Sequence, residues 1–471
     1  MNRLEARISG PQAVGAPADG APADADFYVE RGFEQVAAVN SEGRRTLSSR
    51  RLDGMAIRST GAADRGFFVQ RSGVGARHVG ALLADVVEVA PSIAVHSVGA
   101  ALVSAFQRMD EVDPVSSSFT WTVGELLGLA RESALAHGAE NAEARLWMQE
   151  RSYVSGPAVS AGGAFGEGIS GADTGWLPQQ VGMRRLTVSA GIGAHRGTVT
   201  VADLAERPLT AERAAEAGRK AAERAACIAV AVAPTSARTA VVLAPEAAGV
   251  FVHEVIGHAL EADTAVSSSL WRRRGQSVTH PDLTVRDDAT DSWAWERVVG
   301  DEEGTPCTQA ADLIVGGRVE GVLTDRANAA RLGVRPSGHA RRGAYSNPPV
   351  PRMRHVTVER GPHSPDAIVR DTADGILVLE VGNSDAVPAQ GRFLIRVVEA
   401  REITNGQLGR PLSGFTIHGG LEELAALDAV GDDAAGSVSM CGRQGRWLPV
   451  SHRAPTLRLP HMGIRGKGVP A

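Results

Sequence analysis

The clearest hydrophobic pattern of the chain lies near its middle. Between positions 248 and 260, apolar residues recur at i, i+3, i+4 and i+7, which places them on one face of a helix: Ala248, Phe251, Val252, Val255, Ile256, Ala259 and Leu260. The other face of that helix is polar or open and holds His253, Glu254, Gly257, His258 and Glu261. Pro245 suits the first helical position, and the short apolar run 240–243 predicts a strand before it.

Outside this helix, short alternating stretches predict strands, and longer periodic stretches predict helices. The predicted strands are 27–37, 54–59, 66–70, near 144–153, near 183–190, 311–315, 392–398 and 455–459. The predicted helices are about 75–87, 123–136, and a third that Thr210 opens and that ends near residue 225. Strand and turn signals dominate after residue 260. The fold class expected is therefore α+β.

Four segments follow from these patterns. Amino-terminal α/β modules of mixed antiparallel sheet and helices precede a β-rich carboxyl-terminal domain that carries the amphipathic helix. The expected boundaries are a disordered leader at 1–25, a first module at 26–115, a second module at 116–234 and the β-rich domain at 235–471. The leader is expected to be disordered because residues 11–24 are rich in Ala, Pro, Gly and Asp.

Composition excludes several classes of protein. The 471 residues are 43% hydrophobic, which is enough for two or three domains with cores. A net charge of −5 with 4% aromatic residues gives no broad basic field or stacking platform for nucleic acid. The longest apolar run, 225–233, is far shorter than the roughly 20 residues of a membrane helix. Residues 1–10 have no apolar core, so no targeting segment is expected.

Cysteine usage bears on the compartment. The chain has three cysteines, an odd number without a C-x-x-C pair, which argues against a disulfide framework. A reducing, cytoplasmic location is therefore expected. Cys227 and Cys307 lack the spacing of metal ligands and are interpreted as structural.

Three local features have a plain and a functional interpretation. The basic clusters 272–274 and 341–342 are expected to be solvated or paired, although one could hold a substrate carboxylate or an acidic patch of a partner. The acidic run 301–304 predicts a solvated turn. Residues 166–171 match G-x-G-x-x-G, but no strand precedes them, so a flexible loop is expected there and not a nucleotide site.

The polar face of the central helix holds the parts of a hydrolytic metal site. Imidazole nitrogens of His253 and His258 can bind a metal ion, and the Glu254 carboxylate can deprotonate water. On an ideal helix residues five apart lie about 140° apart, so the two rings do not converge unaided. Either a π-type widening of one turn realigns them, or the ion lies over Gly257. Glu261 and Asp263 are candidate oxygen ligands, although acids at a helix end are more often solvated.

Several further segments occur in an order that resembles the TldD/PmbA family of metallopeptidases, in particular its metal-bearing TldD type. They are HEVIGHALEAD (253–263), GDEEGTPCTQ (300–309), GGRVEGVLTDRANAARLG (316–333), GHARRGAYSNPPVPRMR (338–354) and MCGRQGRWLPVSHRAPTLRL (440–459). The resemblance implies that His253, His258 and Cys441 bind zinc and that Glu254 is the catalytic base. It also implies that 301–304 lies near the core of the metal domain. A lone cysteine such as Cys441 is otherwise often a small buried hydrophobe.

The resemblance further implies hydrolysis of peptide bonds in unstructured peptides inside an enclosed chamber. Such a chain would be the catalytic subunit of a heterodimer with a PmbA/TldE-like partner, or a homodimer. The segment 351–355 (PRMRH) departs from the family, which commonly has a Thr–Asn pair after the Met, and this change bears on substrate choice more than on metal binding. Two alternatives stay open: an amide hydrolase that matures a peptide-like biosynthetic intermediate, and a non-catalytic structural subunit without metal.

Overall fold

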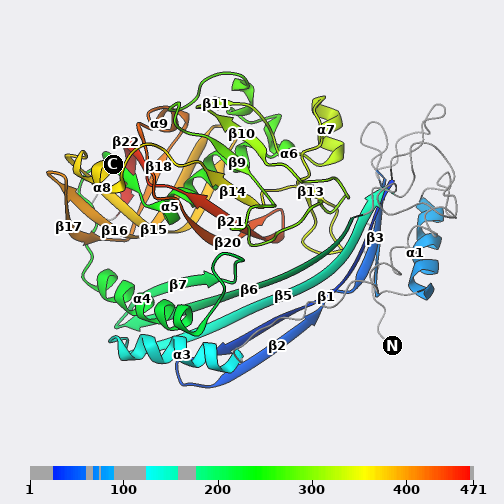
Figure 1. Cartoon of the computed structure of the whole chain (residues 1–471), viewed down its shortest axis with the longest axis horizontal. Helices are drawn as coiled ribbons and strands as arrows, with labels where there is room; N and C mark the ends of the chain where they lie inside the picture. The colour runs from blue at the N-terminus through cyan, green and yellow to red at the C-terminus, as the bar shows by residue number, and fades with distance from the viewer. Residues whose placement is uncertain (1–24, 60–66, 74–75, 90–122, 158–176, 467–471) are drawn as a thin grey trace.

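The structure is a computed structural model that describes residues 25–59, 67–73, 76–89, 123–157 and 177–466. The leader up to residue 24 and the glycine-rich segment 166–171 lie outside the described residues. A long curved sheet runs along the molecule, and a β-rich carboxyl-terminal domain lies against it (Figure 1). The α+β class is therefore confirmed. Among the described helices, none combines the length and the apolar character that crossing a lipid bilayer requires.

The long sheet is built from the amino-terminal half of the chain. Its order is β4 (Phe67–Ser72), β3 (Gly54–Ser59), β1 (Ala25–Val39), β5 (Asn141–Pro157), β6 (Leu177–Ile192) and β7 (His195–Ala202), and β2 (Arg45–Arg51) also pairs with β1. β1 pairs with β5 in antiparallel register from Asp26 opposite Pro157 to Val39 opposite Ala144. Both predicted amino-terminal modules thus contribute strands to one sheet. The domain boundaries themselves stay a prediction.

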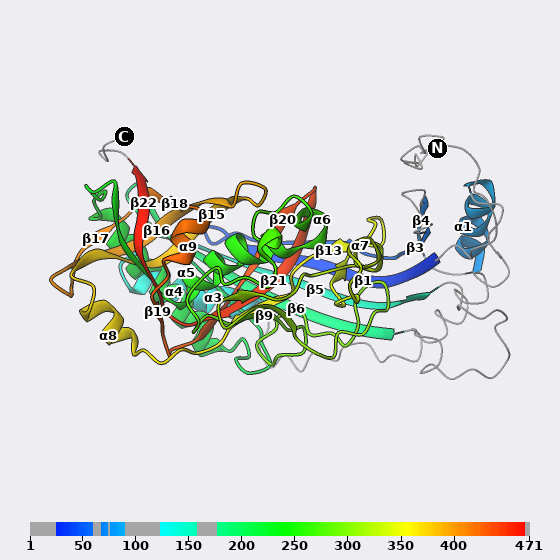
Figure 2. The same ribbon diagram turned by 90° about the horizontal axis from the view of Figure 1, so that it is seen from above.

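Helices α3 (Val123–Ala136) and α4 (Ala211–Ala229) cover one end of this sheet (Figure 1). The strands β3 and β4 and the helix α1 (Ala76–Val89) form the other end (Figure 1). Thr210 caps α4, because its side chain accepts a hydrogen bond from the Arg213 backbone N–H. α3 and α4 pack through small residues, and a Cβ at Gly218 would meet the backbone oxygen of Ala130. In both views α1 lies at one end of the molecule and β17 (Gln407–Leu412) at the other (Figures 1 and 2).

The carboxyl-terminal domain contains two larger sheets and a two-stranded one. The first has the order β15 (Asp374–Val387), β8 (Arg238–Leu243), β22 (Leu457–Gly466), β18 (Phe415–Gly419), β16 (Arg392–Thr404) and β17, with β19 (Ala429–Val430) beside β22. The second has the order β11 (Arg318–Val319), β10 (Ala311–Val315), β9 (Val285–Asp287), β14 (His355–Val358), β21 (Arg446–Ala454) and β20 (Ala435–Arg443). The small sheet pairs β12 (Ala340–Arg341) with β13 (Val350–Pro351).

Helix α5 (Pro245–Val252) contacts both larger sheets, through β15 of the first and β21 of the second. Its apolar face belongs to the domain core, as the hydrophobic pattern predicts, with Phe251, Ile256 and Leu260 fully buried. The remaining short helices are α6 (Ala262–Ala265), a 3₁₀ turn (Trp271–Arg273), α7 (Arg326–Leu332), α8 (Pro365–Arg370) and α9 (Leu421–Ala425). The polar face of α5 and its continuation is thereby fixed in space by two sheets.

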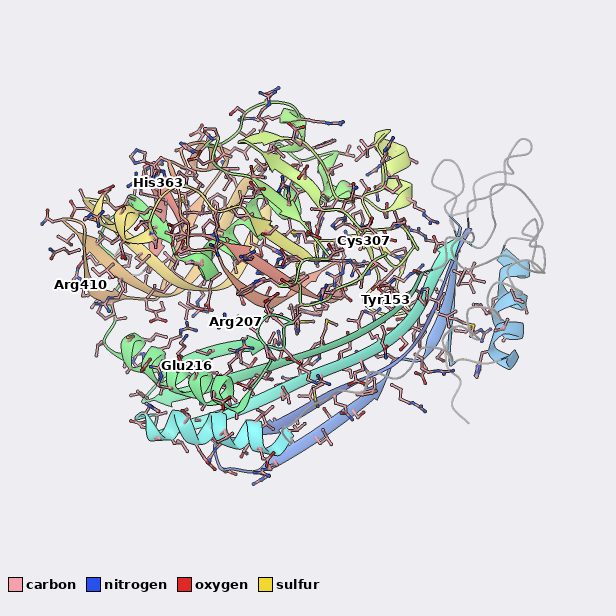
Figure 3. The ribbon with its side chains drawn as sticks, viewed as in Figure 1. Tyr153, Arg207, Glu216, Cys307, His363 and Arg410 are labelled. Atoms are coloured by element: carbon pink, nitrogen blue, oxygen red, sulfur yellow. The ribbon has the colours of Figure 1, made fainter. Side chains whose placement is uncertain are left out.

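An aromatic cluster joins the long sheet to the carboxyl-terminal domain. Tyr28, Trp147 and Tyr153 come from the long sheet, and Trp295 and Cys307 come from the other domain. Tyr153 and Cys307 are labelled in Figure 3. Cys307 is buried in this cluster, which agrees with its structural interpretation.

The prediction that 301–304 is a solvated turn is wrong. Asp301, Glu302 and Glu303 are at most 1% exposed. Arginines from the long sheet pair with this run: Arg58 with Glu303, and Arg151 with Glu302 at 3.2 Å. Local composition could not indicate these partners, because they lie far away in the sequence.

The two basic clusters differ in their surroundings. Arg341 and Arg342 are fully buried and paired, Arg341 with Glu296 at 2.5 Å and Arg342 with Asp26 at 2.8 Å. By contrast, Arg272, Arg273 and Arg274 lie at the surface. The paired interpretation therefore holds for 341–342 and the solvated one for 272–274.

Candidate metal centre

The helix that carries the two histidines changes its winding at the first of them. α5 ends at Val252, a π-helical turn spans His253–Gly257, and a 3₁₀ turn spans His258–Leu260. The His258 backbone N–H donates to the carbonyl of His253, five residues earlier. One extra residue per turn brings residues five apart onto the same side of the helix. Of the two devices that the sequence left open, the π-type widening is the one present.

The space over Gly257 is filled by protein. A Cβ at Gly257 would collide with the thioether sulfur of Met353. The missing side chain therefore lets the segment after β13 approach the helix closely, and the second device, an ion lying over Gly257, is not what the glycine serves.

Three potential ligand atoms converge beside this turn. Cys441, near the end of β20, places its Sγ 3.2 Å from Nε2 of His253 and 3.3 Å from Nε2 of His258. The two imidazole rings lie 4.8 Å apart between centroids, at 79° to each other. All three residues are buried. The sequence places Cys441 more than 180 residues from the histidines, and the fold brings it to them.

The donor set fits zinc. With Zn–S near 2.3 Å and Zn–N near 2.0 Å, tetrahedral ligands lie about 3.5 Å apart in sulfur–nitrogen distance, close to the separations found here. In the described part of the chain, this is the one group of three or more His, Cys, Asp or Glu ligand atoms close enough to share an ion. Three protein ligands leave a coordination position open, which is the arrangement of catalytic zinc sites.

The two candidate oxygen ligands have other partners. Glu261 is fully buried, and its Oε2 lies 2.8 Å from Nδ1 of His258, the ring nitrogen that does not face Cys441. Asp263 accepts a hydrogen bond from the Gln444 side chain at 3.0 Å. A carboxylate on the far nitrogen of a histidine ligand fixes the ring and makes it a stronger ligand. Glu261 is therefore placed to orient the potential ligand His258 and is not itself part of the converging group.

Two arginines also contact Glu261, and one of them contacts Cys441. Arg352 donates from Nη2 to Sγ of Cys441 at 2.8 Å, and its Nε lies 3.2 Å from Glu261. Arg443 also pairs with Glu261. Neither arginine was predicted from the sequence as part of the site. The unusual segment 351–355 was interpreted as bearing on substrate choice, whereas its Arg352 contacts the thiol of Cys441.

Glu254 lies beside the three potential ligands His253, His258 and Cys441. Its Oε2 is 4.0 Å from Nε2 of His258, and its Oε1 accepts a hydrogen bond of 2.7 Å from Oγ of Ser384 on β15. The carboxylate side chain is 14% exposed, so water reaches it. A carboxylate beside the ligand atoms, held by one hydrogen bond and open to water, is placed to act as a general base.

Burial and local charge set the protonation of the two imidazoles in opposite directions. Burial lowers the pKa of His253 well below its ordinary value, and the neighbouring His258 and His452 lower it further. Burial also acts to lower the pKa of His258, but Glu261 and Cys441 outweigh it and raise that pKa to about 10. A metal ion that binds His258 has to displace a proton from its ring, so metal binding at these residues depends on pH.

Comparison with known proteins agrees with this geometry. Residues 236–466 match the family model of the PmbA/TldA metallopeptidase C-terminal domain. A metalloprotease TldD homologue of Haemophilus influenzae is 31% identical over 223 residues, 46% of each chain. A zinc metalloprotease TldD homologue of Saccharolobus solfataricus is 29% identical over 226 residues, 47% of this chain and 50% of its own. The alignments thus span about half the length of the curated relatives.

Solved structures share the fold over nearly the whole chain. A putative modulator of DNA gyrase from Thermotoga maritima aligns with a TM-score of 0.68 at 15% identity, covering 94% of this chain and 96% of its own. TldE from Thermococcus kodakarensis aligns with a TM-score of 0.66 at 15% identity, covering 94% of this chain and 97% of its own. Residues 236–466 therefore form a C-terminal domain of the PmbA/TldD metallopeptidase family.

Proposed function

We propose that this chain is a zinc-dependent peptidase that hydrolyses peptide bonds of unstructured peptides. The observation that carries the proposal is the convergence of the buried donors His253, His258 and Cys441 beside the carboxylate of Glu254. Metalloprotease names among the relatives support the same class of activity.

Each residue has a distinct role in this proposal. His253, His258 and Cys441 hold zinc, which would supply a Lewis acid for the scissile carbonyl and lower the pKa of a water molecule. Glu254 accepts the proton of the attacking water and returns it to the leaving amine. Ser384 holds the Glu254 carboxylate in place through its hydrogen bond. Glu261 orients the His258 ring through Nδ1.

The position of β20 supports an extended substrate. This strand carries Cys441 and is the outermost strand of its sheet in the described part of the chain. The backbone of an outer strand can pair with an extended peptide, so recognition would depend on main-chain hydrogen bonds more than on side-chain sequence. Unstructured peptides meet that requirement, whereas folded proteins do not.

The test of the base is the substitution Glu254→Gln. We expect zinc content to stay at the wild-type level and kcat/KM for an unstructured peptide to fall at least about a hundredfold, the usual contribution of a general base. Glu402→Gln is a matched control, because Glu402 pairs with Arg410 on the surface. Wild-type cleavage by the Glu254 variant in a zinc-replete preparation would remove this residue from the mechanism.

The test of the ligand set is elemental analysis of the purified wild type beside Cys441→Ala and His258→Ala. We expect about one zinc per chain in the wild type and a large loss in both variants, since each removes one of three protein ligands. Stoichiometric zinc in the Cys441 variant would show that the sulfur is not a ligand. A chain that binds no metal at all would instead support the non-catalytic subunit.

The proposal includes a partner and a location. A PmbA/TldE-like chain, or a second copy of this chain, would complete an enclosed chamber, and the TldE-like fold supports such pairing. Co-expression with a TldE-like chain should yield a stable complex on size-exclusion chromatography if the heterodimer forms. All three cysteines are free thiols, which fits the proposed reducing, cytoplasmic location.

A further inference from the structure

The hairpin of β20 and β21 presents two arginines at its tip. Arg443 pairs with Arg446 across the strands, and the residues between them, Gln444 and Gly445, have φ values of 51° and 72°. Two consecutive positive φ values are typical of a tight two-residue hairpin turn. Cys441 lies two residues before Arg443 on the same strand, so all three side chains point to one face of the sheet. Both arginines therefore lie on the face that carries the thiol.

These two arginines differ in their partners. Arg443 pairs with Glu261 and lies 3.6 Å from Asp263. Arg446 donates only to neutral oxygens, the Pro348 carbonyl at 3.2 Å and the Gln444 amide at 3.3 Å. Its Nε is buried without a hydrogen-bond partner, and no ion pair to it is found among the described residues. Arg446 is thus a half-buried cation without a counterion.

The surroundings of Arg446 make the lack of a counterion unfavourable. Burial lowers the pKa of Arg446, and the nearby guanidinium of Arg352 lowers it further, while Asp263 opposes them. Asp263 is already shared by Arg443 and Gln444. Among the described residues, the acidic partners found for the guanidiniums of Arg352, Arg443 and Arg446 are the carboxylates of Glu261 and Asp263. A desolvated cation of this kind gains most from an added carboxylate.

The hairpin register sets how far this cation lies from the candidate metal centre. Arg446 lies opposite Arg443, which is two residues after Cys441 on β20. Two residues of a strand, or of an extended peptide, span roughly 7 Å. We propose that Arg446 recognises a carboxylate of the peptide substrate one or two residues from the cleaved bond, supplied by the carboxyl terminus or by an acidic side chain. This inference rests on the proposed peptidase function, because it takes the substrate to be a peptide.

Binding tests the inference without cleavage. One unstructured decapeptide is made with a free carboxyl terminus, with an amidated terminus, and amidated with one internal Asp; fluorescence anisotropy measures its binding to the full chain carrying Glu254→Gln. We expect one of the two carboxylate peptides to bind about tenfold more tightly than the plain amide. Which of them does so identifies the source of the carboxylate. Adding Arg446→Gln should remove the preference and leave binding of the plain amide unchanged.

Two further variants guard against a general loss of structure. Arg446→Lys keeps the charge and should keep part of the preference. Arg410→Gln, on β17 at the far end of the molecule, should keep all of it (Figure 3). If all three peptides bind alike, if none binds, or if Arg446→Gln keeps the preference, the inference is overturned. Failure of the peptidase proposal is judged separately, by cleavage in the chain with Glu254 intact.

Discussion

At the scale of single residues, one ion pair serves two of the three proposed ligands. Glu261 contacts His258 through one carboxylate oxygen and Arg352 through the other, and Arg352 also donates to Sγ of Cys441. The pKa of Glu261 is lowered although burial alone would raise it, because His258, Arg352 and Arg443 favour the charged form. Glu261 therefore stays ionised in the interior and can accept a hydrogen bond from the Nδ1–H of His258 when a metal takes the other ring nitrogen.

This contact predicts the behaviour of Glu261→Gln. An amide keeps the size of the side chain but loses the charge that holds the His258 ring and pairs with Arg352. We expect zinc affinity to fall about tenfold to a hundredfold, the usual effect of losing such a partner. Competition with a chromophoric chelator measures it, and Glu402→Gln serves as the surface control. An unchanged affinity would mean that the carboxylate does not support the ligand.

At the scale of elements, the sequence predicted the helix that carries His253 and His258 but could not distinguish its possible windings. The apolar period identified the buried face correctly, since that depends on local spacing. The choice between the two devices depended on Met353, which lies almost a hundred residues after Gly257 in the sequence. Contacts of that range leave no trace in a local pattern. For the same reason Arg352 was not selected.

The close approach of Met353 predicts the effect of Gly257→Ala. The added Cβ collides with the thioether, so the π-helical turn or the segment after β13 must shift. We expect a loss of about 1–3 kcal/mol in the free energy of unfolding, the usual cost of overpacking. Chemical denaturation measures it. Combining the change with Met353→Ala should recover part of the loss, and strictly additive losses would show that the two residues do not interact.

At the scale of the whole molecule, the sequence predicted the strands better than their pairing. The segments 27–37 and 144–153 were assigned as strands of two separate modules, and they are neighbours in one sheet. The buried charges between the long sheet and the carboxyl-terminal domain were also missed, as the 301–304 run shows. An acidic run is buried only when cations from distant segments reach it, and sequence spacing does not show that.

This buried network predicts how the stability of the molecule depends on pH. Burial acts to raise the pKa of Glu296, but Arg341, Arg354 and Arg151 outweigh it and lower that pKa to about 2. A carboxyl whose pKa is depressed on folding stabilises the folded state above its unfolded pKa, near 4.3. That stabilisation is lost as the pH falls from about 4.5 to about 2. The contribution is on the order of 3 kcal/mol.

The variant Glu296→Gln tests whether Glu296 causes this loss of stability at acid pH. It leaves the buried guanidiniums without their carboxylate, so we expect a loss of about 3–5 kcal/mol at neutral pH. It should also flatten the decline in unfolding free energy between pH 4.5 and 2, which urea titrations at a series of pH values measure. Asp301, whose pKa burial raises to about 6, contributes the opposite slope between about pH 4 and 6. Because both proteins contain Asp301, its contribution cancels in the difference between them. An acid decline of equal steepness in the variant would place the sensitive group elsewhere.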